Sequence, residues 1–474
     1  MTSAGERPDP VGSATPADAA QLEVARIRRS EIQEVRAVAE RVREARRRGC
    51  RRLVAAFACT LVVGVSLLVA GSTSRGPLDK LSSTRPSSRD PGSAFVVAPA
   101  LHATLSSLKF PGKPAALPLP KIGEGAVVVA GVGVVGDTKD EKTVPIASVT
   151  KIMTAYLVLQ DHPLVGNNGG PVFTMTAADH EAWIEASEAD ESNIEVVAGE
   201  RLDERQLLQA LMIPSANNIA DYLAVWDAGS LPKFVAKMNA TAKALGLTNT
   251  SYADASGFDP KSRSDASDMA KLAAIAMQNP ELRWIVDEQS IRLPVAGEIW
   301  NLYNPAVGVD GIIGVKSGFT SSAQSNLVTA AWRRVGGHRV LVISAVIDQP
   351  LSLYSDALED EALLNAATTE LAATAVVPAQ AQVAQAVAGW NHSQAAVSID
   401  SPAVVVGWPG MPVSLSLVPI RPAAGGTAHG WPEGSTIGML EIRAPFGAEC
   451  AVPAVLGGAI SAPPPGWQPA SSTH

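Results

Sequence analysis

Apolar residues form two kinds of pattern along this chain. Continuous, β-branched runs predict buried strands, and they lie at residues 125–136, 326–332 and 340–347. Gly336 and Gly337 lie between the last two runs, which favours a hairpin. Apolar positions at helical spacing predict helices at residues 151–159, 203–212, 219–226, 232–245 and 267–278. These elements predict an α/β (α+β) fold: an antiparallel sheet flanked by helices, with a helical block inserted between edge strands that are far apart in the sequence.

The same patterns divide the chain into domains. Residues 95–372 carry the alternating strand and helix patterns and are predicted to form the main domain, which ends in a helix at 352–371. Short strand patterns broken by Gly and Pro follow, at residues 395–406, 413–418 and 436–443. They predict a small, all-β C-terminal domain over residues 373–460. Residues 461–474, rich in Pro and Ser, predict a disordered tail.

Residues 53–71 contain no charged side chain. A helix of this length is about 28 Å long, close to the hydrocarbon thickness of a bilayer, so the run predicts a transmembrane helix. A cluster of arginines lies directly before it, and basic residues favour the cytoplasmic side. We therefore expect a single pass through the cell membrane. The leader at 1–52 would be cytoplasmic and partly helical or disordered. A flexible linker at 72–94 would join the membrane helix to an extracytoplasmic catalytic domain. A cleavable signal peptide is the alternative, although fifty residues before the apolar run are unusual for one.

The 474 residues carry a net charge of −8, which is unevenly distributed. Residues 1–52 hold 12 Lys/Arg and 8 Asp/Glu, so the rest of the chain has a net charge of −12. Nucleic acid requires a basic binding surface, which excludes that class of partner for most of the chain. The cysteines, Cys50, Cys59 and Cys450, allow no disulfide within the predicted extracytoplasmic part. The histidines show no spacing typical of zinc ligands, so neither a metal site nor a cofactor is predicted.

Candidate chemistry begins with Ser148 and Lys151, three residues apart at the start of an apolar helix. This spacing places both side chains on one helix face, and the positive end of the helix dipole favours negative charge near Ser148. A neutral lysine can take the serine proton if burial or a neighbouring cation lowers its pKa from about 10.4. The spacing alone is weak evidence. Two further pairs share it: Ser106 with Lys109, and Ser230 with Lys233.

Two more motifs make the first pair far more specific. Ser215-Ala216-Asn217 is the only S-x-N sequence in the chain and lies in a turn between two predicted helices. Lys316-Ser317-Gly318 is the only K-[ST]-G sequence and lies at a predicted strand start. All three motifs, in the order S-x-x-K, S-x-N and K-[ST]-G, are unlikely to occur in one chain by chance.

This set of motifs resembles that of the penicillin-binding and serine β-lactamase superfamily, and most closely that of the low-molecular-mass D-alanyl-D-alanine carboxypeptidases, peptidase family S11. The resemblance covers about residues 122–350 and includes longer blocks such as PIASVTKIMTAY and GVKSGFTSSAQSNLV. It implies a β-lactamase/transpeptidase-like fold and a serine-type D-Ala-D-Ala carboxypeptidase. Such an enzyme removes the terminal D-alanine from peptidoglycan stem peptides through an acyl-enzyme, and β-lactams would be its covalent inhibitors.

The resemblance also implies a role for each motif residue. Ser148 would be the acylated nucleophile, Lys151 its proton acceptor and Ser215 the proton relay to the leaving D-alanine. Asn217 would hold the acyl side-chain amide, and the backbone N–H groups of Ser148 and Phe319 would form the oxyanion hole. The remaining substrate-binding residues, grouped around the substrate carboxylate, would be Lys316, Ser317, Gly318 and Thr320.

Some positions depart from the family pattern. Ser317 stands where threonine is usual, and Asn218 stands where an aspartate often follows the asparagine. Glu361 and Asn365 match the E-x-x-L-N pattern that carries the deacylating base in class A β-lactamases, but here it follows the K-[ST]-G motif, within a predicted helix. We interpret it as a surface segment and expect no rapid β-lactam hydrolysis. Two alternatives stay open: a DD-endopeptidase with the same site, and a non-catalytic β-lactam- or muropeptide-binding sensor or scaffold.

Overall fold

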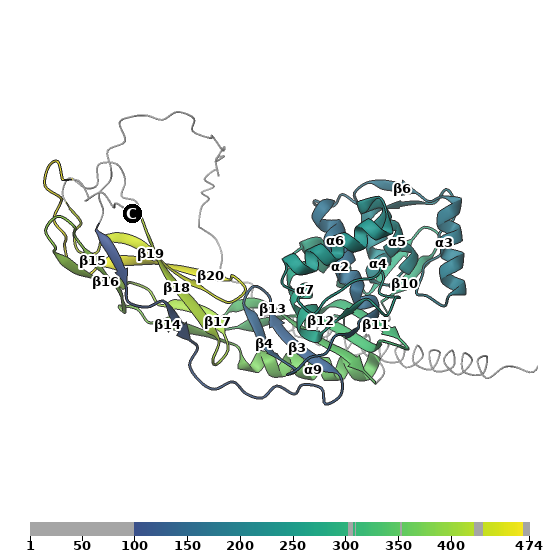
Figure 1. Ribbon diagram of the computed structural model, residues 1–474, viewed down its shortest axis with the longest axis horizontal. Helices are drawn as coiled ribbons and strands as arrows, with labels where there is room; N and C mark the ends of the chain where they lie inside the picture. The colour runs from purple at the N-terminus through teal and green to yellow at the C-terminus, as the bar shows by residue number, and fades with distance from the viewer. Residues whose placement is uncertain (1–98, 302–306, 309, 351–352, 421–429, 468–474) are drawn as a thin grey trace, which may run out of the picture.

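The computed structural model describes residues 99–301, 307–308, 310–350, 353–420 and 430–467. A helical block lies at one end of the molecule, a five-stranded sheet lies beside it, and a β-rich region forms the other end (Figure 1). The mixed α/β class with a β-rich region after it is therefore confirmed.

The central sheet is antiparallel and has the strand order β11-β12-β13-β3-β4. Its edge strands come from opposite ends of the domain sequence, and the helical block lies between them in the chain, as predicted. Gly336 and Gly337 have φ values of +53° and +87°, so glycine permits the left-handed turn between β12 and β13. The strands are β3 (Glu124–Val129), β4 (Gly133–Asp137), β11 (Ile312–Thr320), β12 (Gln324–Val335) and β13 (His338–Gln349).

Helices cover both faces of this sheet. α7 (Ala266–Ala276) packs against β3 and β13 on one face, and α9 (Leu353–Glu370) packs against β12 and β13 on the other. Ala126 of β3 belongs to the hydrophobic core on the α7 side, while its neighbour Val127 belongs to the core on the α9 side. Because side chains alternate between the two faces of a strand, β3 is apolar at nearly every position, which explains the continuous run in the sequence.

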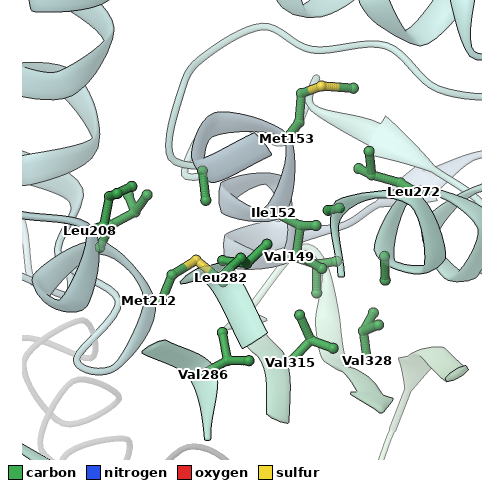
Figure 2. Close-up of a cluster of buried hydrophobic side chains, with 14 of the residues drawn as sticks. Val149, Ile152, Met153, Leu208, Met212, Leu272, Leu282, Val286, Val315 and Val328 are labelled. Atoms are coloured by element: carbon green, nitrogen blue, oxygen red, sulfur yellow. The ribbon is translucent and has the colours of Figure 1, made fainter. Parts of the chain in front are cut away.

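The first of these cores surrounds α2 (Lys151–Asp161), which is buried along most of its length. Figure 2 shows Ile152 and Met153 of this helix among apolar side chains of other helices and of the sheet, including Val315 and Val328. A helix that is apolar on all sides is typical of such a central position. This packing fixes the first turn of α2 between the other helices of the block and strand β11.

The rest of the helical block agrees with the predicted helices to within a few residues, and it adds two. The apolar pattern does not predict α3, because Ala186 is its one buried residue, nor α8, which has only seven residues. Thr176 and Asp203 form capping boxes that start α3 and α4. These helices are α3 (Ala177–Glu188), α4 (Glu204–Met212), α5 (Asn217–Ala228), α6 (Leu231–Ala244) and α8 (Pro280–Val286). Short ribbons join β5 (Val144–Pro145) to β8 (Arg263–Ser264), β6 (Val172–Thr174) to β7 (Arg201–Asp203), and β9 (Ser290–Leu293) to β10 (Gly297–Trp300).

The β-rich region is larger than the sequence pattern indicates. It contains a seven-stranded sheet of order β1-β15-β16-β20-β19-β18-β2 and the pair β14 and β17. The predicted start of the main domain at residue 95 is wrong, because β1 and β2 pair with β15 and β18 of this sheet. Both strands are short and largely exposed, so no apolar period links them to the C-terminal sheet. The strands are β1 (Ala100–Ala103), β2 (Ser107–Lys109), β14 (Ala372–Val377), β15 (Gln382–Val387), β16 (Gln394–Ile399), β17 (Ala403–Gly407), β18 (Pro412–Pro419), β19 (Thr436–Arg443) and β20 (Glu449–Leu456).

The start of the predicted disordered tail also packs on this region. The rings of Trp467 and Trp390 lie with their centroids 5.6 Å apart, and the Trp390 indole Nε1 donates a hydrogen bond to Ser461 O at 3.1 Å. The prediction is therefore wrong for residues 461–467, because a half-buried aromatic contact outweighs the Pro- and Ser-rich composition. Residues 468–474 lie outside the described part of the chain.

The leader at 1–52, the membrane helix at 53–71 and the linker at 72–94 also lie outside the described residues and stay predictions. Within the part that the structure describes, no helix is both long and apolar enough to cross a membrane.

Candidate active site

Ser148 lies in a 3-10 turn, η1 (Ala147–Thr150), that continues directly into α2. Gly257 lies against this turn with a φ of +84°, and a Cβ there would come within 1.8 Å of Ala147 O, so only glycine fits. Lys151 begins α2, and its Nζ donates a hydrogen bond to Ser148 Oγ at 3.0 Å. The structure thus brings the two members of the first motif into direct contact.

Lys151 is fully buried, and its amine contacts two oxygen atoms besides Ser148 Oγ. Nζ donates to Asn217 Oδ1 at 2.6 Å and to Ser256 O at 2.9 Å. Burial lowers the pKa of Lys151 to about 7, although nearby carboxylates oppose the shift. Near neutral pH, a substantial fraction of this side chain is therefore a neutral amine that can accept a proton.

The loop that supplies Ser256 O carries no predicted site residue. The Asp254 carboxylate accepts hydrogen bonds from Ser256 Oγ at 2.8 Å and from Phe258 N at 2.7 Å, which holds the loop in a tight curve. Thr154 Oγ1 of α2 donates to a carbonyl of the same loop at 2.7 Å. These bonds hold the Ser256 carbonyl against Lys151.

Ser215 and Asn217 lie where α4 ends and α5 begins. Ser215 has a φ of +66°, a left-handed conformation that is strained for a residue with a Cβ and is typical of functional turns. Its Oγ is buried and has no hydrogen-bond partner among the residues that the structure describes. The Asn217 Nδ2 donates to Glu191 Oε2 at 2.6 Å. Glu191 lies in an acid-rich stretch where no motif marks it, so the sequence offers no signal for this contact.

Strand β11 borders Ser148 on another side. A Cβ on Gly318 would lie 2.7 Å from Ser148 N, so the strand backbone approaches the nucleophile's turn closely. Lys316 and Ser317 are both buried on this strand, and Lys316 Nζ donates to Ser317 O at 2.9 Å. Burial, together with the charge of Lys151, holds the pKa of Lys316 well below its usual value. The third motif therefore lies beside the first.

The last two predicted site residues differ in their surroundings. Phe319 is 51% exposed, and its backbone pairs with Ser325 of β12. The Thr320 hydroxyl accepts a hydrogen bond from Ala323 N at 3.1 Å and contacts Ser322 Oγ at 3.2 Å. This hydroxyl is held in the β11–β12 turn, and because it accepts from Ala323 N its own hydrogen can still be donated. Its role at the substrate carboxylate stays a prediction.

The structure separates the decoy motifs from this site. Lys109 belongs to β2 in the C-terminal sheet, with Ser106 just before it, and Ser230 is the residue that precedes α6. Glu361 lies on α9, which belongs to the core on the other side of the sheet from α2 and α7. Glu361 is half-buried and Asn365 is exposed, which agrees with the interpretation of this motif as a surface segment of a helix.

Comparisons with known proteins agree with the motifs. The family model described as D-alanyl-D-alanine carboxypeptidase matches residues 127–350. A D-alanyl-D-alanine carboxypeptidase of a Streptomyces species is 31% identical over 210 residues, which cover 41% of this chain and 69% of that protein. The carboxypeptidase DacC of Escherichia coli is 34% identical over 201 residues, which cover 40% of this chain and 48% of that protein. The chain spans about half the length of several curated relatives that it matches. Penicillin-binding protein 5 from Haemophilus influenzae has a similar fold, with a TM-score of 0.52, 19% identity, and coverage of 74% of this chain and 99% of that one.

Proposed function

Because this chain belongs to the D-alanyl-D-alanine carboxypeptidase family, we propose that it removes the terminal D-alanine from peptidoglycan stem peptides that end in D-alanyl-D-alanine. The observation that carries the proposal is the contact between the Ser148 hydroxyl and a fully buried Lys151 whose pKa is lowered to about 7. A lysine in this state can act as a general base without histidine.

The first chemical step uses the neutral form of Lys151. A neutral amine has two N–H groups and one lone pair, and the oxygens of Asn217 and Ser256 can accept both N–H groups. The lone pair then points to Ser148 Oγ, the third contact of the amine. As the amine takes the hydroxyl proton, Oγ forms a bond to the carbonyl carbon of the penultimate D-alanine, and the carbonyl oxygen becomes an oxyanion. The N–H groups of Ser148 and Phe319 would stabilise this charge.

The second step breaks the peptide bond. We assign the proton delivery to Ser215, whose buried hydroxyl has no hydrogen-bond partner among the described residues. Its hydroxyl would give its proton to the leaving nitrogen and recover one from protonated Lys151, while the oxyanion returns to a carbonyl and the C–N bond breaks. Lys316 would bind the carboxylate of the leaving D-alanine, and the second N–H of the Asn217 amide would bind the acyl-side carbonyl. In deacylation, neutral Lys151 would take a proton from water as the water oxygen bonds to the acyl carbon. The bond from that carbon to Ser148 Oγ then breaks, Oγ recovers the proton from Lys151, and the shortened peptide leaves with a free carboxylate. A β-lactam would enter the same acylation step and remain bound.

The direct test is incubation of the full chain with a peptide that ends in D-alanyl-D-alanine, followed by measurement of released D-alanine. Labelling with a fluorescent penicillin identifies the nucleophile: Ser148→Ala should abolish both activities, while Ser106→Ala and Ser230→Ala should leave them intact. Labelling without D-alanine release would favour the non-catalytic binding module instead. Cleavage of a cross-linked peptide dimer, without release of D-alanine, would identify a DD-endopeptidase.

We also propose that residues 53–71 anchor the protein in the cell membrane, with the catalytic domain outside. The uncharged run and the arginines before it support this orientation. A protease added to intact cells should then digest the chain after residue 71 and spare residues 1–52. Protection of the catalytic domain would overturn the orientation.

A further inference from the structure

Glu191 lies in the loop between α3 and β7 and is half-buried beside the first turn of α5. Its Oε2 accepts a hydrogen bond from Asn217 Nδ2 at 2.6 Å, and Asn217 N donates to Ser192 O at 2.7 Å. Asn218 is bound to the same loop through both ends of its amide: Nδ2 donates to Ile194 O at 3.0 Å, and Oδ1 accepts from Ile194 N at 3.3 Å. The loop and the start of α5 therefore form one hydrogen-bonded unit.

The hydrogen bond to Glu191 determines which end of the Asn217 amide faces Lys151. An ionised carboxylate only accepts hydrogen bonds, so it selects the amide nitrogen and leaves the amide oxygen on the opposite side. That oxygen is the atom 2.6 Å from Lys151 Nζ. If the amide were reversed, its N–H would donate to the lone pair of neutral Lys151 and compete with Ser148 for it.

We propose that Glu191 is a positioning residue for acylation: it holds the Asn217 amide so that the lone pair of Lys151 points to Ser148. This inference rests on the proposed function, because it assigns the proton transfer to Lys151. Glu191 would act through Asn217 and would not itself contact the reacting atoms.

Glu191 also contributes charge to the site. Three charged groups act on Lys151: Asp254 from the loop that carries Ser256, Asp221 from α5, and Glu191 from its loop. Lys316 of β11 also lies near Lys151 and has its own pKa lowered by it. The three carboxylates favour the protonated form of Lys151. Removal of the Glu191 charge should therefore lower the pKa of Lys151 and move the pH dependence of acylation to lower pH.

Two variants separate orientation from charge. Glu191→Gln removes the charge and keeps an oxygen that can accept from Asn217 Nδ2, but its own N–H can also donate, so it selects the Asn217 orientation less strictly. Glu191→Ala removes both the charge and the hydrogen-bond partner. Glu195→Gln is the matched control, because Glu195 is exposed in the same loop. The measurement is the single-turnover rate of acylation of the full chain by a fluorescent penicillin from pH 5 to pH 9, with the melting temperature of each variant.

We expect Glu191→Ala to lower the plateau rate at high pH by about ten- to a hundredfold, since misorientation of a catalytic group has losses of this order. Glu191→Gln should stay within about threefold of the wild-type plateau, with its midpoint at lower pH. Glu195→Gln should change neither quantity. If Glu191→Ala does not fold, the plateau rate of Glu191→Leu decides the question, because leucine fills similar space but cannot accept from Asn217 Nδ2.

A wild-type plateau rate in folded Glu191→Ala or Glu191→Leu would overturn the positioning role of Glu191. Failure of the wild-type chain to form an acyl-enzyme at Ser148 is a separate result, and it would overturn the proposed function instead.

Discussion

The close approach of β11 to the nucleophile makes Gly318→Ala the sharpest test of the site geometry. The added Cβ would lie 2.7 Å from Ser148 N, 3.0 Å from Val149 N and 3.1 Å from the Ala147 Cβ. Two of these neighbours are backbone atoms of a turn packed against the core, so they cannot swing aside as a flexible side chain would. The strand and the turn must therefore separate.

The size of the separation follows from the contact distances. Ordinary van der Waals contact of a Cβ begins at 3.4 Å, so the backbone of β11 must retreat by about 0.7 Å from Ser148 N. Overpacking of this kind costs about 1–3 kcal/mol of unfolding free energy. Because a misplacement of about 1 Å at a reacting centre costs about a hundredfold in rate, we expect acylation to slow by roughly ten- to a hundredfold.

The assay is the rate of acylation by a fluorescent penicillin, together with urea unfolding of the same sample. Gly458→Ala is the matched control, since a Cβ on Gly458 would meet its nearest neighbour, the Ala395 Cβ, only at 3.9 Å. This control should change neither the acylation rate nor the stability. Acylation of Gly318→Ala within threefold of wild type would refute the close contact between β11 and the serine turn, and with it the proposed oxyanion hole.

Three further predictions concern protonation and substrate binding. Because burial lowers the pKa of Lys151 to about 7, the acylation rate of the wild-type chain should rise about tenfold between pH 6 and pH 8, and a flat profile would contradict Lys151 as the base. Burial, together with three nearby carboxylates, raises the pKa of Glu141 to about 8 in the folded chain. In the unfolded chain the same group loses its proton near pH 4.5. Glu141 therefore lowers the free energy of unfolding progressively as the pH rises from about 4.5 to 8. Glu141→Gln should therefore raise the urea midpoint at pH 8 more than at pH 5, and an equal change at both pH values would contradict the assigned shift. Ser317 is buried beside Lys316; Ser317→Thr should change kcat/KM less than about tenfold, while Ser317→Ala should lower it roughly ten- to a hundredfold through loss of a hydrogen bond to the substrate carboxylate. Steady-state kinetics with a D-alanyl-D-alanine peptide would check this order, and the reverse order would make residue 317 a steric limit of the pocket.

Much of the architecture could be predicted from local sequence. The continuous apolar runs correspond to β3, β12 and β13, because a strand covered on both faces needs apolar residues at nearly every position. Ser148 and Lys151 could be paired from their spacing of one helical turn, because the S-x-N and K-[ST]-G motifs distinguish them from the two other pairs with this spacing. Short or exposed elements such as β1 and α3 could not be found in this way, because their stability comes from neighbours that the local pattern does not contain.

Only the tertiary structure decided what surrounds the amine of Lys151. Asn217 Oδ1 comes from 66 residues away in the sequence and Ser256 O from 105 residues away, and the second is a backbone atom that carries no residue signature. Glu191 belongs to the site through its bond to Asn217, although nothing in its local sequence distinguishes it from other acidic residues. The sequence by itself determined which side chains are candidates for the site and in what order they occur. The fold determined their protonation and orientation, because desolvation and hydrogen-bond direction depend on atoms that only long-range packing brings together.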